Sequence, residues 1–148
     1  MGDSSGDSSV VGPREVPAAQ VMQIGEVAER TGLSLRSIRY YEEVGLVLPS
    51  ARSHGGYRLY TPADLQRFGV VMGMKPLGFS LEEMRDLLGA LDALEQESDG
   101  AARDALLARL AEFHARADER CASLRRKLGT AEALSERLGG LLDEHGPV

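Results

Sequence analysis

The sequence predicts a mainly helical protein, in which a small N-terminal domain containing a β-hairpin precedes one long C-terminal helix. Three observations support this fold class. Short segments with apolar residues at helical spacing fill residues 24–91, and glycine, proline or capping residues separate them. Ser-His-Gly-Gly at residues 53–56 interrupts an alternating stretch, as a hairpin turn does. Residues 101–142 contain no proline.

Composition excludes several classes of protein. The chain has 148 residues and a single cysteine, Cys121, which rules out an intramolecular disulfide framework and a cysteine-rich zinc site. Residues 1–21 are rich in Gly, Ser and Asp, which predicts a flexible tail without an apolar signal segment. Since the sequence has no apolar run of about 20 residues, we expect a cytoplasmic protein without a membrane partner.

Two short helices are expected first. Ile24, Val27 and Ala28 share one helical face, and Gly32 suits the end of that helix. Ser34 is a favourable N-cap for a second helix over residues 35–44, which Gly45 ends. The buried face of this helix is expected to hold Leu35, Ile38 and one of the two adjacent tyrosines, Tyr41 rather than Tyr40. Two short helices joined by a tight turn form a helix-turn-helix.

A hairpin and two more helices complete the predicted domain. The glycines of residues 53–56 supply the turn of the hairpin. Thr61, followed by proline, begins a third helix that must stop before Pro76. Ser80 with Glu83 forms a capping box at the start of a fourth helix.

Residues 101–142 carry a weak heptad stripe, with several small or polar members. A helix of this length exposes more apolar surface than a domain of some seventy residues can cover, so we expect a second copy of the chain to cover it. The stripe also includes Ala131, Ser135 and Leu142. The residues assigned to the dimer contact are Leu107, Leu110, His114, Ala117, Cys121, Leu124, Leu128 and Leu138.

The net charge of −6 argues against an anionic partner, but the charge is unevenly distributed. Residues 22–80 carry seven basic and five acidic residues, whereas residues 81–148 carry nine basic and fifteen acidic ones. Because affinity for phosphates depends on local charge and specific contacts, the first segment remains compatible with nucleic acid.

Three segments resemble a known family in order and spacing: "IRYYEEVGL", "GGYRLYTPADL" and "LGFSLEEM". With their surroundings, residues 22–91, they resemble the mercury-resistance-regulator (MerR) family of bacterial transcription regulators. The resemblance implies a winged helix-turn-helix domain followed by a dimerisation coiled-coil helix. It also implies that the second helix enters the major groove of DNA and that the hairpin, as a wing, follows the backbone.

The resemblance assigns DNA contacts to particular residues. Arg36 and Arg39 suit phosphates or guanine edges, and Ser34 offers a hydroxyl at a helix N-terminus. For Tyr60, packing against the domain is as plausible as a DNA contact, and isolated arginines are more often solvated surface charges. The residues assigned to DNA are Ser34, Arg36, Arg39, Tyr40, Arg52, Tyr57, Arg58 and Lys75.

The sequence departs from the family pattern at two places. Pro76 occupies a position where relatives carry a polar helix former. Metal- and redox-sensing members carry two or more cysteines near the end of the long helix, whereas Cys121 is alone and in mid-helix. A metal shared by Cys121 and His114 of two chains is conceivable, since they lie one heptad apart, but two seam residues are the favoured interpretation. We therefore expect no metal and no cofactor.

These observations predict residues 1–21 as a tail, residues 22–95 as a winged helix-turn-helix DNA-binding domain, and residues 96–148 as a coiled-coil dimerisation helix with a short tail. The predicted function is a homodimeric regulator that binds promoter DNA, distorts it and affects its use by RNA polymerase. The alternative is a protein–protein interaction module whose acidic coiled coil docks another regulator or a sigma factor. No arrangement of His, Ser, Cys or Asp suggests an enzyme.

Overall fold

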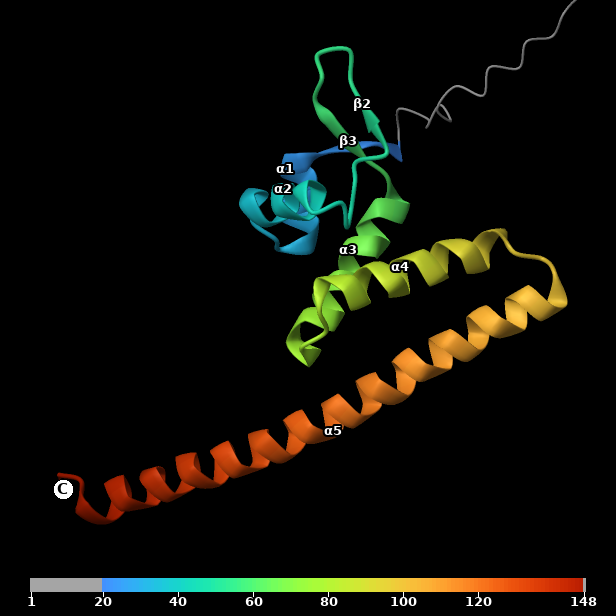
Figure 1. The fold of residues 1–148 in the computed structure, drawn as a ribbon. Coiled ribbons are helices and arrows are strands. Elements are labelled where there is room, and N and C mark those ends of the chain that lie inside the picture. The colour runs from blue at the N-terminus through green and yellow to red at the C-terminus, as the bar shows by residue number, and fades with distance from the viewer. Residues whose placement is uncertain (1–19, 148) are drawn as a thin grey trace, which may run out of the picture. The chain divides into compact units, whose positions relative to one another are not determined.

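The computed structural model describes residues 20–147, so all but two residues of the predicted tail lie outside it. The described part is mainly helical, with three short strands and the turns that connect these elements (Figure 1). Its contacts define two compact units, Met1–Val71 and Met72–Val148, each described separately below. The predicted boundary between residues 95 and 96 falls inside the second unit and remains a prediction.

The first unit has the predicted helix-turn-helix and hairpin. It comprises β1 (Met22–Gln23), α1 (Ile24–Thr31), α2 (Leu35–Glu43), β2 (Ala51–Arg52), β3 (Arg58–Tyr60) and most of α3 (Pro62–Met74). The sheet is antiparallel, in the order β1-β3-β2, with Met22 opposite Tyr60 and Arg52 opposite Arg58. β1 was not predicted because a two-residue strand has no recognisable periodicity.

The ends of α2 follow the predicted capping. The Ser34 hydroxyl accepts a hydrogen bond from the Ser37 amide at 3.1 Å. At the other end Gly45 has φ 71°, a left-handed conformation that favours glycine. The Leu46 amide then donates to the Tyr41 carbonyl at 2.9 Å, which closes a Schellman motif and reverses the chain.

A buried carboxylate connects the start of α3 to the segment before the wing. Asp64 accepts hydrogen bonds from the Thr61 amide at 3.0 Å and from the Ser50 hydroxyl at 2.6 Å. Thr61 returns the contact by accepting from the Asp64 amide at 3.2 Å. Since Asp64 and Thr61 are both buried, these bonds satisfy the helix N-terminus and fix where the hairpin begins.

An aromatic cluster joins α2, β3 and α3. The ring of Phe68 lies 6.4 Å from that of Tyr41 and 5.9 Å from that of Tyr60, measured between centroids. Tyr41 is 5% exposed whereas Tyr40 is 44% exposed, which confirms the predicted choice between them. Tyr60 is fully buried and so packs against the domain. The prediction for Leu35 was wrong: it is 41% exposed, because Ile38 and Tyr41 alone form the buried face of the short α2.

Replacing Tyr60 by phenylalanine is expected to stabilise the first unit by about 1 kcal/mol, because the buried hydroxyl has no hydrogen-bond partner among the described residues. Burial also raises the pKa of the Tyr60 phenol. Above pH ~10 the unfolded chain releases this proton more readily than the folded state does, so the wild-type protein loses stability as the pH rises, whereas the phenylalanine variant has no phenol to ionise. Thermal melts of both proteins at neutral and alkaline pH check this. Equal melting temperatures throughout would contradict it.

The second unit is a helical hairpin. After α3 come the 3-10 turn η2 (Lys75–Leu77), α4 (Leu81–Gln96) and α5 (Gly100–His145). The predicted stop before Pro76 is confirmed, since α3 ends at Met74. The predicted capping box is present as well: Ser80 accepts from the Glu83 amide and Glu83 accepts from the Ser80 amide, each at 3.1 Å. At 46 residues, α5 is about 69 Å long.

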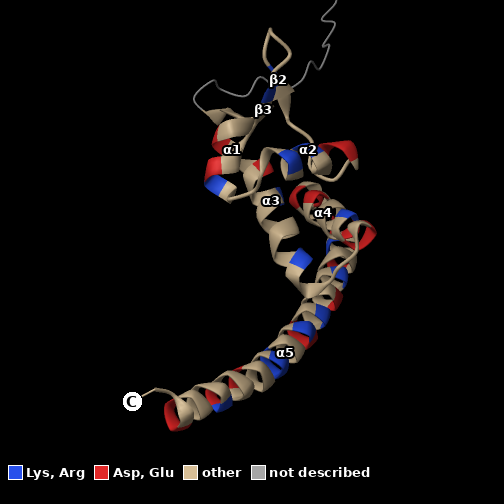
Figure 2. Ribbon diagram, turned by 90° about the vertical axis from the view of Figure 1, so that its left-hand side faces the viewer, with Lys and Arg blue, Asp and Glu red and all other residues tan. Residues whose placement is uncertain are grey.

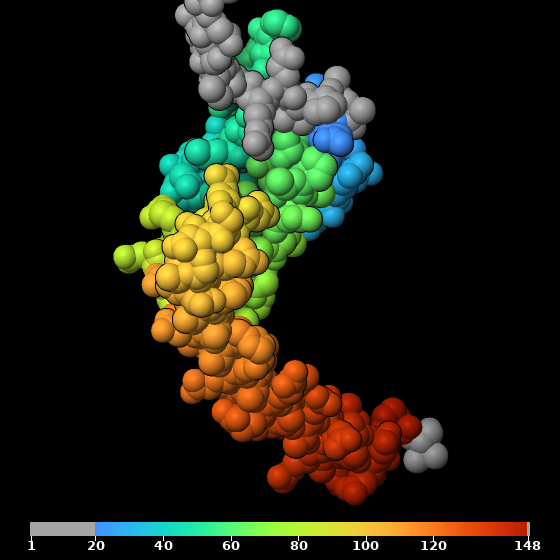
Figure 3. Space-filling view, turned by 90° about the vertical axis from the view of Figure 1, so that its right-hand side faces the viewer, coloured from blue at the N-terminus to red at the C-terminus, as the bar shows by residue number. Residues whose placement is uncertain are grey.

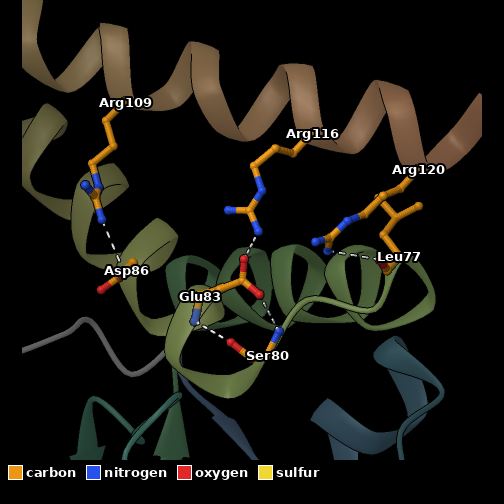
Figure 4. A network of polar contacts seen from close by, with 7 residues as sticks. All are labelled: Leu77, Ser80, Glu83, Asp86, Arg109, Arg116 and Arg120. Atoms are coloured by element: carbon orange, nitrogen blue, oxygen red, sulfur yellow. Dashed lines mark hydrogen bonds and ion pairs between the residues drawn. The ribbon is translucent and has the colours of Figure 1, made fainter.

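Arginines in the first half of α5 hold this part of the helix against α4 (Figure 4). Arg109 contacts Asp86 at 3.2 Å, and Arg116 forms an ion pair with Glu83, the capping-box residue. Arg120 donates to the Leu77 carbonyl at 3.2 Å and lies over the Phe79 ring, 4.3 Å from its centroid. The sequence does not predict this packing, because the apolar stripe of α5 indicates only a contact with another chain.

On the face that Figure 3 shows, no other described element of the second unit covers the second half of α5. All described side chains from Leu124 to His145 are exposed. They include six leucines that are 41–71% exposed: Leu124, Leu128, Leu134, Leu138, Leu141 and Leu142. Within residues 20–147, no helix has a stretch long and apolar enough to cross a membrane.

Candidate nucleic-acid interface

The exposed side of α2 carries two arginines and a tyrosine. Ile38 and Tyr41 face the core, with 0% and 5% of their surface exposed. Arg36, Arg39 and Tyr40 occupy other positions on the helix and are exposed. A helix with a basic, accessible side is suited to phosphates and base edges in a major groove.

Ser34 caps the N-terminus of α2. Its hydroxyl accepts from the Ser37 amide and donates to the Ser37 hydroxyl at 3.0 Å. The Ser34 hydroxyl is thus already engaged in capping α2. A DNA contact at this position therefore involves the exposed N-terminus of the helix.

The hairpin presents a tyrosine beside its glycine turn. Tyr57 is 68% exposed. The Gly56 amide donates to the Ser53 carbonyl and the Ser53 amide donates to the Tyr57 carbonyl, both at 2.9 Å, which closes the turn. Gly56 has φ 79°, so glycine is favoured there. A Cβ on Gly55 would lie 3.0 Å from the Tyr57 ring, so that side chain limits what can replace Gly55.

One carboxylate on α2 contacts both arginines of the wing. Glu42 accepts from Arg52 Nη2 at 2.7 Å and from the Arg58 Nε–H group, one through each carboxylate oxygen. Arg52 also donates from Nη1 to the Gly56 carbonyl at 3.1 Å. The hydrogen bond to Glu42 raises the pKa of the Arg58 guanidinium above its usual value, so this group stays charged at any working pH.

Glu42 was missed by sequence analysis. It lies in the motif "IRYYEEVGL" as part of an acidic pair, Glu42-Glu43, inside an otherwise arginine-rich segment. Helix spacing alone does not show which of the two faces the wing, since that depends on the hairpin, whose place is set by tertiary packing. Along α5, acidic and basic residues are interspersed (Figure 2).

The remaining predicted residues lie in the second unit. Lys75 is exposed in η2. Of the residues assigned to the dimer contact, Leu110, Ala117 and Cys121 are half-buried, and the others are exposed. His114 contacts Asp118, one turn along α5, at 3.3 Å. Among residues 20–147, no three His, Cys, Asp or Glu side chains are placed to hold a metal.

Comparison with known families decides the classification. Residues 22–91 match the model described as MerR HTH family regulatory protein, and residues 65–141 match the model described as MerR, DNA binding. The chain belongs to the MerR family. The resemblance stated from the sequence motifs is thereby confirmed.

Relatives within the MerR family are named as transcriptional regulators. HmrR of Rhizobium leguminosarum bv. viciae is 43% identical over 56% of this chain and 60% of its own length. CueR of Salmonella typhimurium is 31% identical over 82% of this chain and 80% of its own length. The matched segment spans less than two thirds of HmrR and of YfmP of Bacillus subtilis.

Solved structures of MerR-family regulators share the fold. HiNmlR, described as a regulator lacking the sensor domain and bound to promoter DNA, has a TM-score of 0.63 at 21% identity, covering 85% of this chain and 95% of that one. A putative regulator from Listeria monocytogenes has a TM-score of 0.50 at 28% identity, covering 84% and 85%. The predicted fold class, a winged helix-turn-helix followed by a long helix, is confirmed.

Proposed function

We propose that this MerR-family chain is a homodimeric, cytoplasmic transcription regulator that binds double-stranded promoter DNA. The observation that carries the proposal is the exposed side of α2, where Arg36, Arg39 and Tyr40 are accessible while Ile38 and Tyr41 anchor the helix. In this proposal α2 lies in the major groove and Arg36 and Arg39 reach base edges or phosphates. The wing, with Arg52, Tyr57 and Arg58, contacts the backbone.

Regulation is proposed to act through the shape of the DNA. Backbone contacts position a protein but do not specify a sequence, so much of the specificity must come from a few residues of α2 and from deformation of the duplex. Distortion of promoter DNA in turn changes how RNA polymerase engages it. Ser34 and Lys75 complete the proposed DNA-contacting set.

The dimer is proposed to form through α5. Leu124, Leu128 and Leu138 are 41%, 58% and 50% exposed, and no other element of the second unit covers them. Exposed leucines at helical spacing along so long a helix suit burial against an equivalent helix.

In vitro selection from random duplexes tests the function as a whole. The wild-type protein is expected to enrich sequences with two-fold symmetric half-sites, because a symmetric dimer reads two equivalent grooves. Enrichment of no sequence would contradict the proposal and favour the protein–protein interaction module.

Replacing Leu128 and Leu138 together by glutamate is expected to convert the dimer into a monomer. Each leucine contributes about 1.5–3 kcal/mol when buried, so dissociation should become at least roughly a hundredfold easier. Sedimentation over a range of concentrations measures this. Leu48→Glu is the matched control, since Leu48 is 56% exposed outside α5. A dimer that survives both substitutions would contradict the assignment of the interface.

A further inference from the structure

We propose that Glu42 is a positioning residue for DNA binding, because it ties both wing arginines to the end of α2 through one carboxylate. The inference rests on the proposed function, since it concerns how that DNA-binding surface is held in shape. Glu42 lies within the motif "IRYYEEVGL", but the resemblance assigns it no contact.

The geometry makes Glu42 a bridge between two elements. Its Oε1 accepts from Arg52 on β2 and its Oε2 accepts from Arg58 on β3, while Glu42 itself lies in the last turn of α2. Its side chain is 16% exposed, compared with 49% for Arg52 and 30% for Arg58. A partly desolvated pair of this kind is more strongly held than a surface ion pair.

The bridge leaves the arginines able to bind phosphate. Glu42 takes only Nε–H of Arg58 and one terminal nitrogen of Arg52. Arg52 also donates one Nη1–H to the Gly56 carbonyl. Because a guanidinium has five N–H donors, both side chains still have donors left for an anion. The two arginines and Glu42 together carry one net positive charge. The group therefore still attracts a single backbone phosphate, although it contains a carboxylate.

The physical gain is preorganisation. Free arginine side chains lose rotamer freedom when DNA orders them, which weakens binding. With Glu42 in place, that ordering has occurred before DNA arrives, and the distance from the wing to α2 is fixed. The opposing effect is repulsion between the Glu42 carboxylate and phosphate, so the two effects predict opposite results for removal of its charge.

Glu42→Gln and Glu43→Gln separate these effects, because both remove one negative charge from neighbouring positions of α2 and only Glu42 contacts the arginines. Affinities are measured by fluorescence anisotropy on the duplex enriched with wild-type protein. We expect Glu43→Gln to bind as tightly as wild type or slightly tighter, and Glu42→Gln to bind about tenfold more weakly than Glu43→Gln. Equal or tighter binding by Glu42→Gln would overturn the proposal and leave Glu42 as a source of repulsion.

Two further variants exclude a general loss of structure. Glu42→Asp keeps the charge but shortens the side chain, so it should also weaken binding several-fold. In a background with Arg52→Ala and Arg58→Ala, Glu42→Gln should have less than a twofold effect, because there is nothing left to position. A tenfold effect that persists in this background would show a role in α2 folding alone and would overturn the proposal.

A readout without DNA keeps this inference distinct from the proposed function. The Arg58 Nε–H group is expected to exchange slowly with solvent in NMR spectra of wild type and of Glu43→Gln, and rapidly in Glu42→Gln. Fast exchange in wild type would overturn the bridge whatever DNA does. Slow exchange together with failure to enrich any duplex would contradict the proposed function instead.

Discussion

Replacing Arg39 by alanine is expected to weaken binding to the enriched duplex by about 1–3 kcal/mol, or roughly 5- to 150-fold. Arg39 is exposed on α2, between the buried residues Ile38 and Tyr41, so its alanine variant loses contacts to DNA without losing core packing. Fluorescence anisotropy at fixed salt measures the change. Unchanged circular dichroism of the variant would show that the fold is intact.

Arg30→Ala is the matched control for charge. Arg30 is also an exposed helical arginine, but it lies on α1 and contacts Glu26 at 2.9 Å. It is expected to change affinity less than threefold. Arg58→Ala provides a second comparison: it should weaken binding to all duplexes alike. It should also reduce the slope of log affinity against log salt by about 1.8, or about 0.9 for each chain of the dimer. If Arg39→Ala, Arg30→Ala and the wild-type protein bound the duplex with equal affinity, this would contradict the place of α2 in the interface.

Replacing Phe68 by alanine is expected to lower the free energy of unfolding of the first unit by about 3–5 kcal/mol. Phe68 is fully buried and its ring packs near those of Tyr41 and Tyr60, so its removal leaves a cavity in the core. Since whole domains are stable by about 5–15 kcal/mol, this is a large fraction. Because Tyr41 anchors α2 and Tyr60 anchors the wing, DNA binding should weaken together with stability.

Urea denaturation measures this effect, and two variants control it. Phe68→Leu keeps most of the buried apolar surface and is expected to lose less than half as much stability. Phe113→Ala removes a half-buried ring in the second unit and should leave binding per folded molecule unchanged. A melting curve of Phe68→Ala that coincides with wild type would contradict the role of the aromatic cluster.

Local signals in the sequence determine most of the fold. Ser34, Gly45 and Ser80 predict helix boundaries because a cap is a short-range interaction between neighbouring residues. The choice of Tyr41 as the buried tyrosine follows from helix geometry alone. Strand β1 could not be predicted, since it exists only through its pairing with β3.

Contacts between distant elements were the part that sequence analysis missed. Arg116 and Arg120 belong to a helix whose apolar stripe suggested only a dimer, yet they contact Glu83 and Leu77 more than thirty residues away. Glu42 and Arg58 are sixteen residues apart and meet because the hairpin folds back on α2. Arg36 and Arg39 were easier to place, because exposure on one side of a short helix follows from its period.

Hydroxyl-radical footprinting of wild-type protein on the enriched duplex tests the proposed mode of binding most directly. A homodimer that places α2 in the groove and the wing on the backbone should protect two equivalent stretches of backbone, related by two-fold symmetry, with two chains bound per duplex. Protection should shrink at the outer edge of each stretch for Arg58→Ala. A single protected stretch, one chain per duplex or no protection at all would contradict it.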